Sequence, residues 1–321
     1  MDCKAVTCPP EQIQKGVAQK NRLENIYMYL GSHKLKFENV EVDAEDLEKA
    51  REELRETPEI VRESLETLRK LVKEETSLNY PTDDDKLQIF LRPCKYYPNS
   101  ALTRMKKFYK FKFQHPNYSK NLIPSCETRA FKQNLLTILP YRNKRGERIL
   151  VLEIGQKWKT SSCTLKEILR SAMLIVEAAL EEPKTQINGV QVIIDMTGLA
   201  LQHVWQFTPG FAKHVVDWVQ DCIPLRLKGI HIVNQPYVFN MLYAIFKPFL
   251  GTKLQKRIVF HGSHFDTLHS HISPSVLPKQ YGGDLDIPFD KGAELHKYLE
   301  RYDSEFQERQ IYGYTKAPPK D

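Results

Sequence analysis

The densest group of side chains able to bind a metal or move a proton lies in the segment HGSHFDTLHSHIS. Imidazole and carboxylate groups are zinc ligands, but their spacing in this segment fits no standard zinc motif. The pattern is more typical of a strand that ends in a loop with capping and surface histidines. We therefore expect no metal site among its four histidines and one aspartate, which are His261, His264, Asp266, His269 and His271.

Asp195 is the second candidate for acid–base chemistry. It closes the apolar run GVQVIID, and parallel sheets bind ligands at the carboxyl ends of their strands. A short acidic side chain also forms turns, and no nucleophile accompanies Asp195, so a structural role is favoured. Because the chain has no GxGxxG or GxxxxGKS/T phosphate loop and no GxSxG elbow, we expect neither an enzyme nor a bound cofactor.

Cysteine usage and hydropathy bear on the compartment of the protein. The cysteines form no CxxC pair, and the chain begins without the apolar run of a secretory signal. No segment reaches the ~20 apolar residues that a membrane-spanning helix needs. We therefore expect a soluble, cytoplasmic protein with reduced thiols at its six cysteines, which are Cys3, Cys8, Cys94, Cys126, Cys163 and Cys222.

Charge is distributed unevenly along the chain, whose net charge is +7. Between Glu38 and Asp85 there are 17 acidic and 7 basic residues, whereas Lys86 to Arg148 contains 15 basic and 2 acidic ones. From Cys222 to Phe265 there are 6 basic residues and no carboxylate. One of the two basic blocks is expected to meet a negative partner, for which lipid phosphates and nucleic acids are the usual candidates.

Nucleic-acid binding is supported only by the first basic block, where aromatic and basic residues alternate in MKKFYKFKF. These aromatics recur at helical spacing, which is more typical of a helix packed on a domain than of a nucleic-acid interface. We expect no nucleic-acid partner.

The elements that must position any site change in character along the chain. Residues 1–80 show helical spacing of apolar residues, and Thr57 before Pro58 divides them into at least two helices. Further helices are expected to open at Asp83–Asp85 and at Pro98–Ser100. After residue 130, four apolar runs are predicted strands and alternate with amphipathic helices, which predicts a mainly parallel sheet with crossover helices. The predicted strands are RILVLEIG, GVQVIIDMTG, LKGIHIVNQ and RIVFHG, and KGAELHKYLERYDSEFQERQ is predicted as one C-terminal helix.

The segment from Pro236 to Leu250 is predicted to be a helix that is apolar on almost every face. Such a helix is either buried throughout or lies against lipid, and periodicity alone would favour a core helix. The cations around it have no neighbouring carboxylate, and apolar surface bordered by cations is typical of an element that meets anionic headgroups. These cations are Lys247, Lys253, Lys256 and Arg257, with Arg226 and Lys228 upstream.

Several motifs in order resemble the CRAL-TRIO (Sec14-like) lipid-binding family, and within it the group of the α-tocopherol transfer protein, the retinaldehyde-binding protein and the clavesins. From Asn188 to Gly283 they are NGVQVIIDMTGL, TPGFAKHVVDWVQDCIPLRLKGIHIVNQP, KPFLGTKLQKRI and LPKQYGG. Upstream, DDKLQIFLRPCKYYPNSALTRMKKFYKF resembles the family's N-terminal helical domain, except that Pro93 must shorten its first helix or redirect the exit. The resemblance implies an apolar pocket under a mobile lid formed by Pro236 to Leu250, whose opening releases the ligand.

The resemblance also carries over site residues. The implied ligand-pocket positions are Leu169, Ala172, Val176, Ile194, Val215, Trp218, Val219, Phe239, Leu242 and Ile245. The implied phosphoinositide-binding positions are Arg226, Lys228, Lys253 and Arg257. Two serines of the tocopherol carrier's pocket are replaced by Ala172 and Val176, and a valine is replaced by Trp218. These changes predict a drier, differently shaped cavity, so α-tocopherol is not carried over as the ligand.

The predicted fold is α/β, with an N-terminal helical domain over 1–116, a CRAL-TRIO domain with a mainly parallel sheet and a helical lid over 117–289, and a C-terminal helix and tail over 290–321. The predicted function is an intracellular carrier of one retinoid, tocopherol, other terpenoid or phospholipid. It is expected to be a monomer that docks reversibly on phosphoinositides of endosomal or other anionic membranes. The alternative is a phosphoinositide-binding recruitment module or scaffold without cargo transfer.

Overall fold

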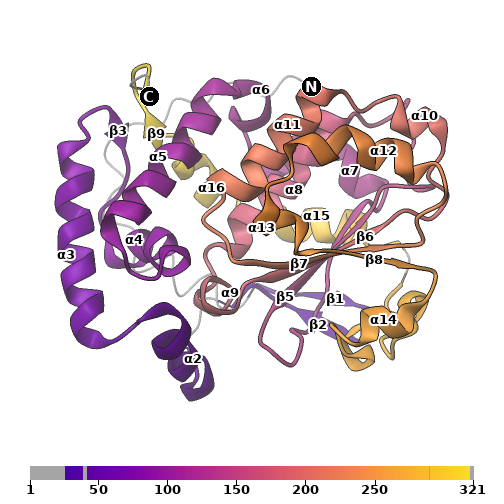
Figure 1. Cartoon of the computed structure of the whole chain (residues 1–321), viewed down its shortest axis with the longest axis horizontal. Coiled ribbons are helices and arrows are strands. Elements are labelled where there is room, and N and C mark those ends of the chain that lie inside the picture. The colour runs from indigo at the N-terminus through magenta and orange to yellow at the C-terminus, as the bar shows by residue number, and fades with distance from the viewer. Residues whose placement is uncertain (1–25, 39–41, 289, 319–321) are drawn as a thin grey trace.

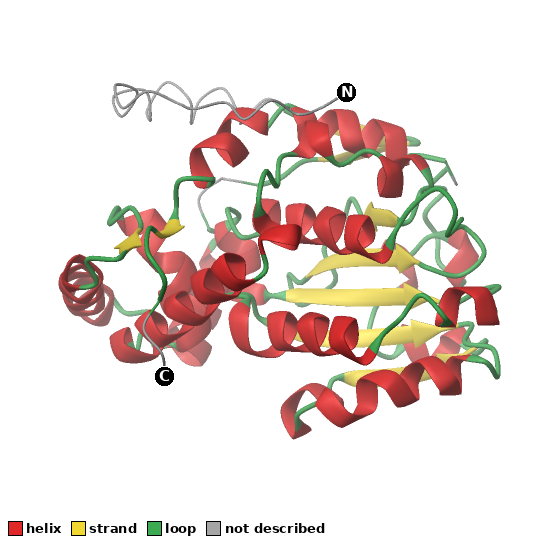
Figure 2. Ribbon diagram, turned by 90° about the horizontal axis from the view of Figure 1, so that it is seen from above, coloured by secondary structure: helices red, strands yellow, loops and turns green. Residues whose placement is uncertain are grey.

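The computed structural model describes residues 26–38, 42–288 and 290–318. A five-stranded sheet with the order β4-β5-β6-β7-β8 lies at its centre. β5 to β8 are parallel and point the same way in Figure 2, whereas β4 pairs antiparallel with β5 at the edge. The mixed α/β architecture with a mainly parallel sheet is therefore confirmed. The strands are β4 (Leu136–Ile138), β5 (Arg148–Glu153), β6 (Val190–Asp195), β7 (Leu227–Val233) and β8 (Ile258–Gly262).

All four predicted strands are present. β5, β6 and β7 are mostly buried, as is usual for parallel strands covered on both faces, whereas β8 at the sheet edge has only His261 buried. On one face lie α8 (Leu165–Ala179), α11 (Pro209–Asp217) and α12 (Phe239–Phe246), as Figure 1 shows. On the other face Ile149, Val151, Ile193 and Val233 pack with residues around α14 (Phe265–His269). β4 was not predicted, because three residues are too few to show a periodicity.

Side-chain hydrogen bonds fix the starts of α8 and α11. Thr164 and Glu167 form a reciprocal capping box that fixes the start of α8, and the Thr208 hydroxyl accepts a hydrogen bond from the Phe211 backbone at the start of α11. α11 continues into a single π-helical turn over Trp218–Cys222. The predicted helix over 236–250 is divided into α12 and a 3-10 turn over Lys247–Phe249, which contains Pro248.

Among the described helices that precede the sheet, four are those that the sequence indicates: α2 (Ala44–Leu54), α3 (Pro58–Glu74), α4 (Asp84–Leu91) and α5 (Pro98–Gln114). α4 ends before Pro93, which lies in a 3-10 turn, as its missing N–H requires. α3, α4 and α5 surround a second apolar core. The remaining short helices are α6 (Pro116–Ser119), α7 (Arg129–Lys132), α9 (Pro183–Asn188), α10 (Leu201–Val204) and α13 (Thr252–Gln255).

The prediction that residues 1–80 are helical is wrong for the segment from Met28 to Leu35, which forms the hairpin β1 (Met28–Leu30) and β2 (His33–Leu35). Met28 and Leu30 are buried while Tyr29 is exposed, which is the alternation of a strand. Gly31 has φ +65° and makes the turn that a helix could not contain. A further short strand, β3 (Leu78–Asn79), pairs with β9 (Gly313–Tyr314) and returns the C-terminal segment to the N-terminal helices.

The C-terminal helix is also divided, into α15 (Gly292–Glu300) and α16 (Asp303–Arg309). Tyr302 lies between them with φ −102° and ψ 10°. Its ring packs edge-on against Phe37 and Tyr298, with ring centroids 5.7 and 5.6 Å away. The three-part division of the chain at residues 116 and 289 remains a prediction.

The predictions of reduced cysteines and of no membrane-spanning helix can be checked within the described residues. Cys94, Cys163 and Cys222 are free thiols, but Cys126 is disulfide-bonded, so the prediction of reduced cysteines is wrong for that residue. Cys3 and Cys8 lie outside the described residues. Within the described ranges, no helix has both the length and the apolar character needed to cross a bilayer.

The histidine-rich segment takes part in a buried polar network between β7 and β8. His261 Nε2 lies 2.9 Å from Nδ1 of His231, and His261 Nδ1 lies 2.7 Å from the Thr267 hydroxyl. His231 Nε2 is in turn 2.9 Å from the side-chain oxygen of Gln191. In the part of the chain that the structure describes, no three potential ligands converge on a metal position. Of the other histidines in the segment, His271 packs against the ring of His231, and His269 Nε2 forms a hydrogen bond with the Tyr281 carbonyl. His264 is exposed.

The buried position of His231 predicts a specific acid sensitivity. Burial, with smaller contributions from His261 and His271, lowers the pKa of His231 from 6.5 to about 3. The native state keeps the ring neutral, whereas the unfolded chain binds a proton below pH 6.5. This contribution to stability is therefore complete above pH 6.5 and is lost as the pH falls from there toward 3, by up to ~1.4 kcal/mol per pH unit for one proton.

Urea denaturation at a series of pH values should show that His231→Gln flattens the decline in unfolding free energy between pH 6.5 and 4. Carboxylates also lower stability in acid, so the quantity compared is the difference between the slopes of variant and wild type. The same exchange at the exposed His264 is the control, and its slope should match the wild type. Equal slopes for wild type and His231→Gln would contradict the prediction.

Candidate ligand-binding cavity

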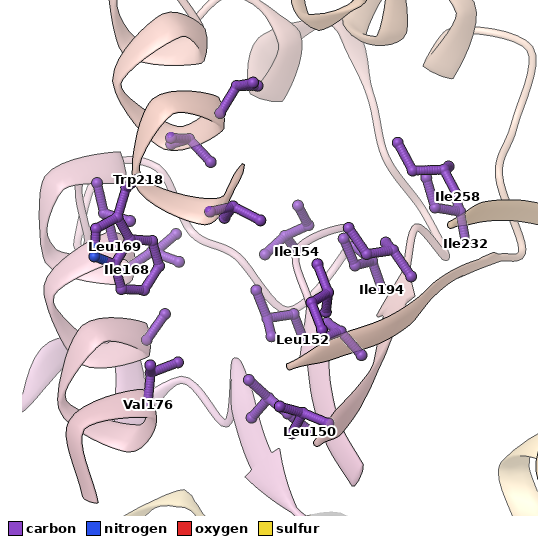
Figure 3. A pocket seen from close by; sticks show the side chains of 18 of the residues that line it. Leu150, Leu152, Ile154, Ile168, Leu169, Val176, Ile194, Trp218, Ile232 and Ile258 are labelled. Atoms are coloured by element: carbon purple, nitrogen blue, oxygen red, sulfur yellow. The ribbon is translucent and has the colours of Figure 1, made fainter. Parts of the chain in front are cut away.

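Two rows of apolar side chains on one face of the sheet form the floor of a cavity. Alternate residues of a strand share a face, and the parallel register aligns them across neighbouring strands. Figure 3 shows side chains from all four parallel strands facing the same space. The first row is Leu150, Val192, Ile230 and Ile258, and the second is Leu152, Ile194 and Ile232, all of which line the cavity.

α8 forms the wall opposite the sheet. Its lining residues recur at steps of one, three or four, which places them along one face of the helix. In Figure 3 Ile168, Leu169 and Val176 face the strands across the cavity, with Trp218 of the π-helical turn beside them. The lining residues of α8 are Leu165, Ile168, Leu169, Ala172, Ile175, Val176 and Ala179.

α12 covers the cavity with one face and presents apolar side chains to solvent with the other. Phe239, Leu242, Tyr243 and Phe246 line the cavity. Tyr237, just before the helix, is 91% exposed, and Met241 within the helix is 52% exposed. Ring contacts hold α12 to its neighbours: Phe246 lies 5.8 Å from Phe207, and Phe239 and Tyr243 lie 5.7 and 5.2 Å from Phe260 of β8.

The cavity has a volume of about 280 Å³. Its lining side chains are apolar or aromatic with one charged exception, Arg148. The guanidinium of Arg148 is engaged by Glu182, with Nε 3.2 Å from Oε2. Burial alone would raise the pKa of Glu182, but Arg148 and Arg142 outweigh it and hold that pKa below its ordinary value. The cavity therefore presents no unpaired charge, and an apolar molecule can fill it without desolvating one.

Nine of the ten predicted pocket residues line this one cavity: Leu169, Ala172, Val176, Ile194, Val215, Trp218, Val219, Phe239 and Leu242. The tenth, Ile245, is half-buried on α12 and packs against the main core, but it is not a lining residue. That these residues bind a ligand remains a prediction.

Sequence reasoning missed several lining residues. Phe246 follows Leu242 by one helical turn, so the spacing of α12 could have identified it. Phe207 and Phe211 lie at the start of α11, where a loop and a first turn leave no clear periodicity. Phe37 lies far upstream of the sheet, and no pattern in the sequence connects it with a pocket.

Asp195 holds the carboxyl end of β6 rather than facing the cavity. Its carboxylate accepts hydrogen bonds from the Thr197 backbone at 2.9 Å, from Asn234 at 3.1 Å and from the Tyr281 hydroxyl at 3.1 Å. The carboxylate thereby connects the loops that follow β6 and β7 with the segment around Tyr281. This arrangement agrees with the structural role favoured from the sequence.

Three of the four predicted phosphoinositide-binding cations gather at the amino ends of β7 and β8. Arg226 forms an ion pair with Glu53 of α2, and Lys228 Nζ lies 3.4 Å from the same carboxylate. Burial, followed by the nearby Arg226, lowers the pKa of both Lys228 and Arg257. The fourth cation, Lys253, is exposed on α13. Glu53, which the sequence did not single out, therefore occupies part of the predicted anion site.

Comparison with known proteins shows which domain and which relatives this chain is similar to. Residues 132–283 match the model of the CRAL/TRIO domain. Alpha-tocopherol transfer protein-like of Homo sapiens is 35% identical over 217 residues, which are 67% of this chain and 63% of that protein. Clavesin-2 of Mus musculus is 32% identical over 280 residues, which are 86% of this chain and 85% of that protein.

The match thus spans less than two thirds of the first relative and most of the second. Among solved structures, the crystal structure of Sfh5 is similar over 80% of this chain and 97% of its own, with a TM-score of 0.42 and 15% identity. The identity to Clavesin-2 over most of both proteins, together with the domain match, is sufficient to assign a family. This chain belongs to the CRAL/TRIO (Sec14-like) family of lipid-binding proteins.

Proposed function

We propose that this protein is an intracellular carrier that binds one hydrophobic small molecule and transfers it between membranes. The observation that carries the proposal is the apolar cavity of about 280 Å³ under α12, a helix whose outer face is also apolar. This volume is close to the lower end of the ~300–1,000 Å³ range of ligand pockets. Molecules of the right chemistry are a retinoid, a tocopherol, another terpenoid or a phospholipid.

The lining favours a cargo with few polar groups. Ala172, Val176 and Trp218 lie where the resemblance places two serines and a valine in the tocopherol carrier, and all three line the cavity. A hydroxyl or carbonyl buried here without a partner would cost about 1–3 kcal/mol. A hydrocarbon-rich cargo meets no such cost, and it gains from leaving water.

α12 is proposed to be the lid that opens at a membrane. Its inner face covers the cavity, and its outer face exposes Tyr237 and Met241. Nearby, Trp205 of the α10 region is 72% exposed, and aromatic side chains favour the membrane interface. Ring contacts to Phe207 and Phe260 can be exchanged for contacts with lipid tails without leaving a hydrogen bond unmade.

Docking is proposed to use the four predicted cations at endosomal or other anionic membranes. Lys253 is exposed on α13, and Arg226, Lys228 and Arg257 lie together at the amino ends of β7 and β8. Each cation near an anionic surface contributes roughly 1 kcal/mol. The protein is proposed to act as a monomer, reversibly bound to the membrane surface.

Filling the cavity is the first test of the carrier. Ala172→Trp places an indole in the cavity and should abolish binding of a fluorescent retinoid or tocopherol analogue, because the space is already occupied. Binding to phosphoinositide vesicles should be retained, which separates a carrier from a recruitment module without cargo. Ala244→Trp adds the same ring on the exposed side of α12 and is the matched control. If organic extraction of protein purified from cells yields no apolar ligand, and no analogue binds the wild type, the carrier proposal is wrong.

Charge reversal tests the docking surface. Lys253→Glu combined with Arg257→Glu should weaken binding to vesicles containing phosphatidylinositol phosphates by at least about tenfold at low salt, with a smaller effect at high salt because of screening. Lys70→Glu with Lys73→Glu makes the same change of net charge on the exposed face of α3 and is the control. Equal vesicle affinities for the two double variants in a sedimentation assay would exclude this surface as the docking site.

Glu53 should act against docking, because its carboxylate pairs with two of the four cations. Glu53→Gln removes this competing negative charge and should raise vesicle affinity about two- to fivefold, which corresponds to the ~0.5–1 kcal/mol of a partly exposed ion pair. Glu52→Gln changes the net charge equally on the neighbouring exposed residue and should have a smaller effect. An unchanged or lower affinity of Glu53→Gln relative to Glu52→Gln would show that Glu53 does not compete with lipid.

A further inference from the structure

Phe37 closes the cavity at the amino ends of the strands. It is 9% exposed and lines the cavity. Other lining residues in this region are Arg148 and Val190, the first residues of β5 and β6, and Ala179, the last residue of α8. α12, in contrast, follows the carboxyl end of β7. Phe37 and the proposed lid therefore bound different ends of the cavity.

The segment 36–38, which we call the clasp, is fixed by polar contacts on every residue. The Lys36 carbonyl accepts a hydrogen bond from Arg148 at 3.3 Å. The Phe37 backbone N–H donates to the Tyr298 hydroxyl at 2.6 Å, and the Glu38 backbone N–H donates to Glu182 at 2.8 Å. The Glu38 carboxylate also pairs with Arg142, whose Nε lies 2.7 Å away.

These contacts hold the Phe37 ring in one position. The ring stacks on Tyr298, with centroids 5.5 Å apart and planes inclined by 26°, and meets Tyr302 edge-on. The backbone of the clasp bonds to Arg148, Glu182 and the Tyr298 hydroxyl, so moving the segment would leave these buried groups with fewer hydrogen bonds. The end wall of the cavity is therefore more firmly held than α12, which is fixed by ring contacts.

We propose that Phe37 sets the length limit of the cavity and is a specificity-determining residue for an extended apolar cargo. The proposal rests on the proposed carrier function, but Phe37 lies outside residues 132–283 that match the CRAL/TRIO domain. A cargo that enters beneath α12 extends along the strands until it meets this ring. Truncation of the ring adds space that is continuous with the cavity, whereas a larger ring removes space.

The physical consequence is a shift in preferred chain length. Each methylene that still fits in the cavity contributes roughly fourfold to affinity, and a methylene that does not fit gains nothing or forces strain. Affinity plotted against length therefore rises to a maximum and then falls. Phe37→Ala moves the maximum to longer chains, and Phe37→Trp moves it to shorter ones.

The experiment measures displacement of the fluorescent polyene cis-parinaric acid by straight-chain alkanols of increasing length. Wild type, Phe37→Ala, Phe37→Leu and Phe37→Trp are compared as full-length proteins, and the graded Leu variant serves if the Ala variant does not fold. Phe306→Ala is the matched control, since Phe306 is fully buried in the same core but does not line the cavity. Its maximum should coincide with that of the wild type.

A maximum that moves to longer chains for Ala or Leu and to shorter chains for Trp supports the proposal. The same maximum in every folded Phe37 variant overturns it while leaving the carrier function intact. If the wild type binds neither cis-parinaric acid nor any alkanol, the carrier function fails, and the role of Phe37 fails with it.

Discussion

An apolar cavity is a destabilising feature, and much of the structure serves to keep this one open. At ~24 cal/mol per Å³ an empty space of about 280 Å³ costs on the order of 7 kcal/mol, comparable with the net stability of an ordinary domain. The sheet resists collapse because its backbone groups are paired across five strands. α8 is held from behind by Arg170, which pairs with Glu127 and donates to the backbone carbonyls of Lys120 and Asn121. A molecule that fills the space therefore stabilises the fold and is retained for the same reason.

The walls of the cavity differ in the kind of interaction that holds them, so one end of the cavity is held more firmly than the other. The end at Phe37 is fixed by hydrogen bonds to the buried ion pair of Arg148 and Glu182 and to the Tyr298 hydroxyl, which must be broken before the segment can move. α12 is fixed by contacts between rings such as Phe246 and Phe207, and lipid tails can replace such contacts at little cost. Motion at α12 is accordingly the way into the cavity that we propose.

The sequence predicts the sheet and most helices because the signals are local. Apolar runs of strand length, Thr57 before Pro58 and the break at Pro93 act through neighbouring residues, and each is found where expected. The floor of the cavity follows from the pleat of those strands. The clasp could not be predicted, because the contacts that fix Phe37 join it to Tyr298, 261 positions away in sequence. The hairpin β1–β2 was missed although its turn at Gly31 is a local signal. Ile245 was included because α12 is apolar on almost every face, so hydropathy alone does not show which of its residues line the cavity.

The fold pairs some of the unevenly distributed charges with each other and leaves others exposed to solvent. Much of the basic block from Lys86 to Arg148 is used internally: Lys86 pairs with Glu181, Lys112 with Glu177 and Arg92 with Glu56, at 2.8 to 2.9 Å. The pairs of Lys86 and Lys112 attach α4 and α5 to the C-terminal part of α8 and the residues after it, so these cations are engaged within the protein. The second block follows the sheet edge beside α12, where Lys247, Lys253 and Lys256 are exposed. Lys247 directly follows α12 in the chain, so attraction of this lysine to an anionic membrane would bring the proposed lid to the lipid.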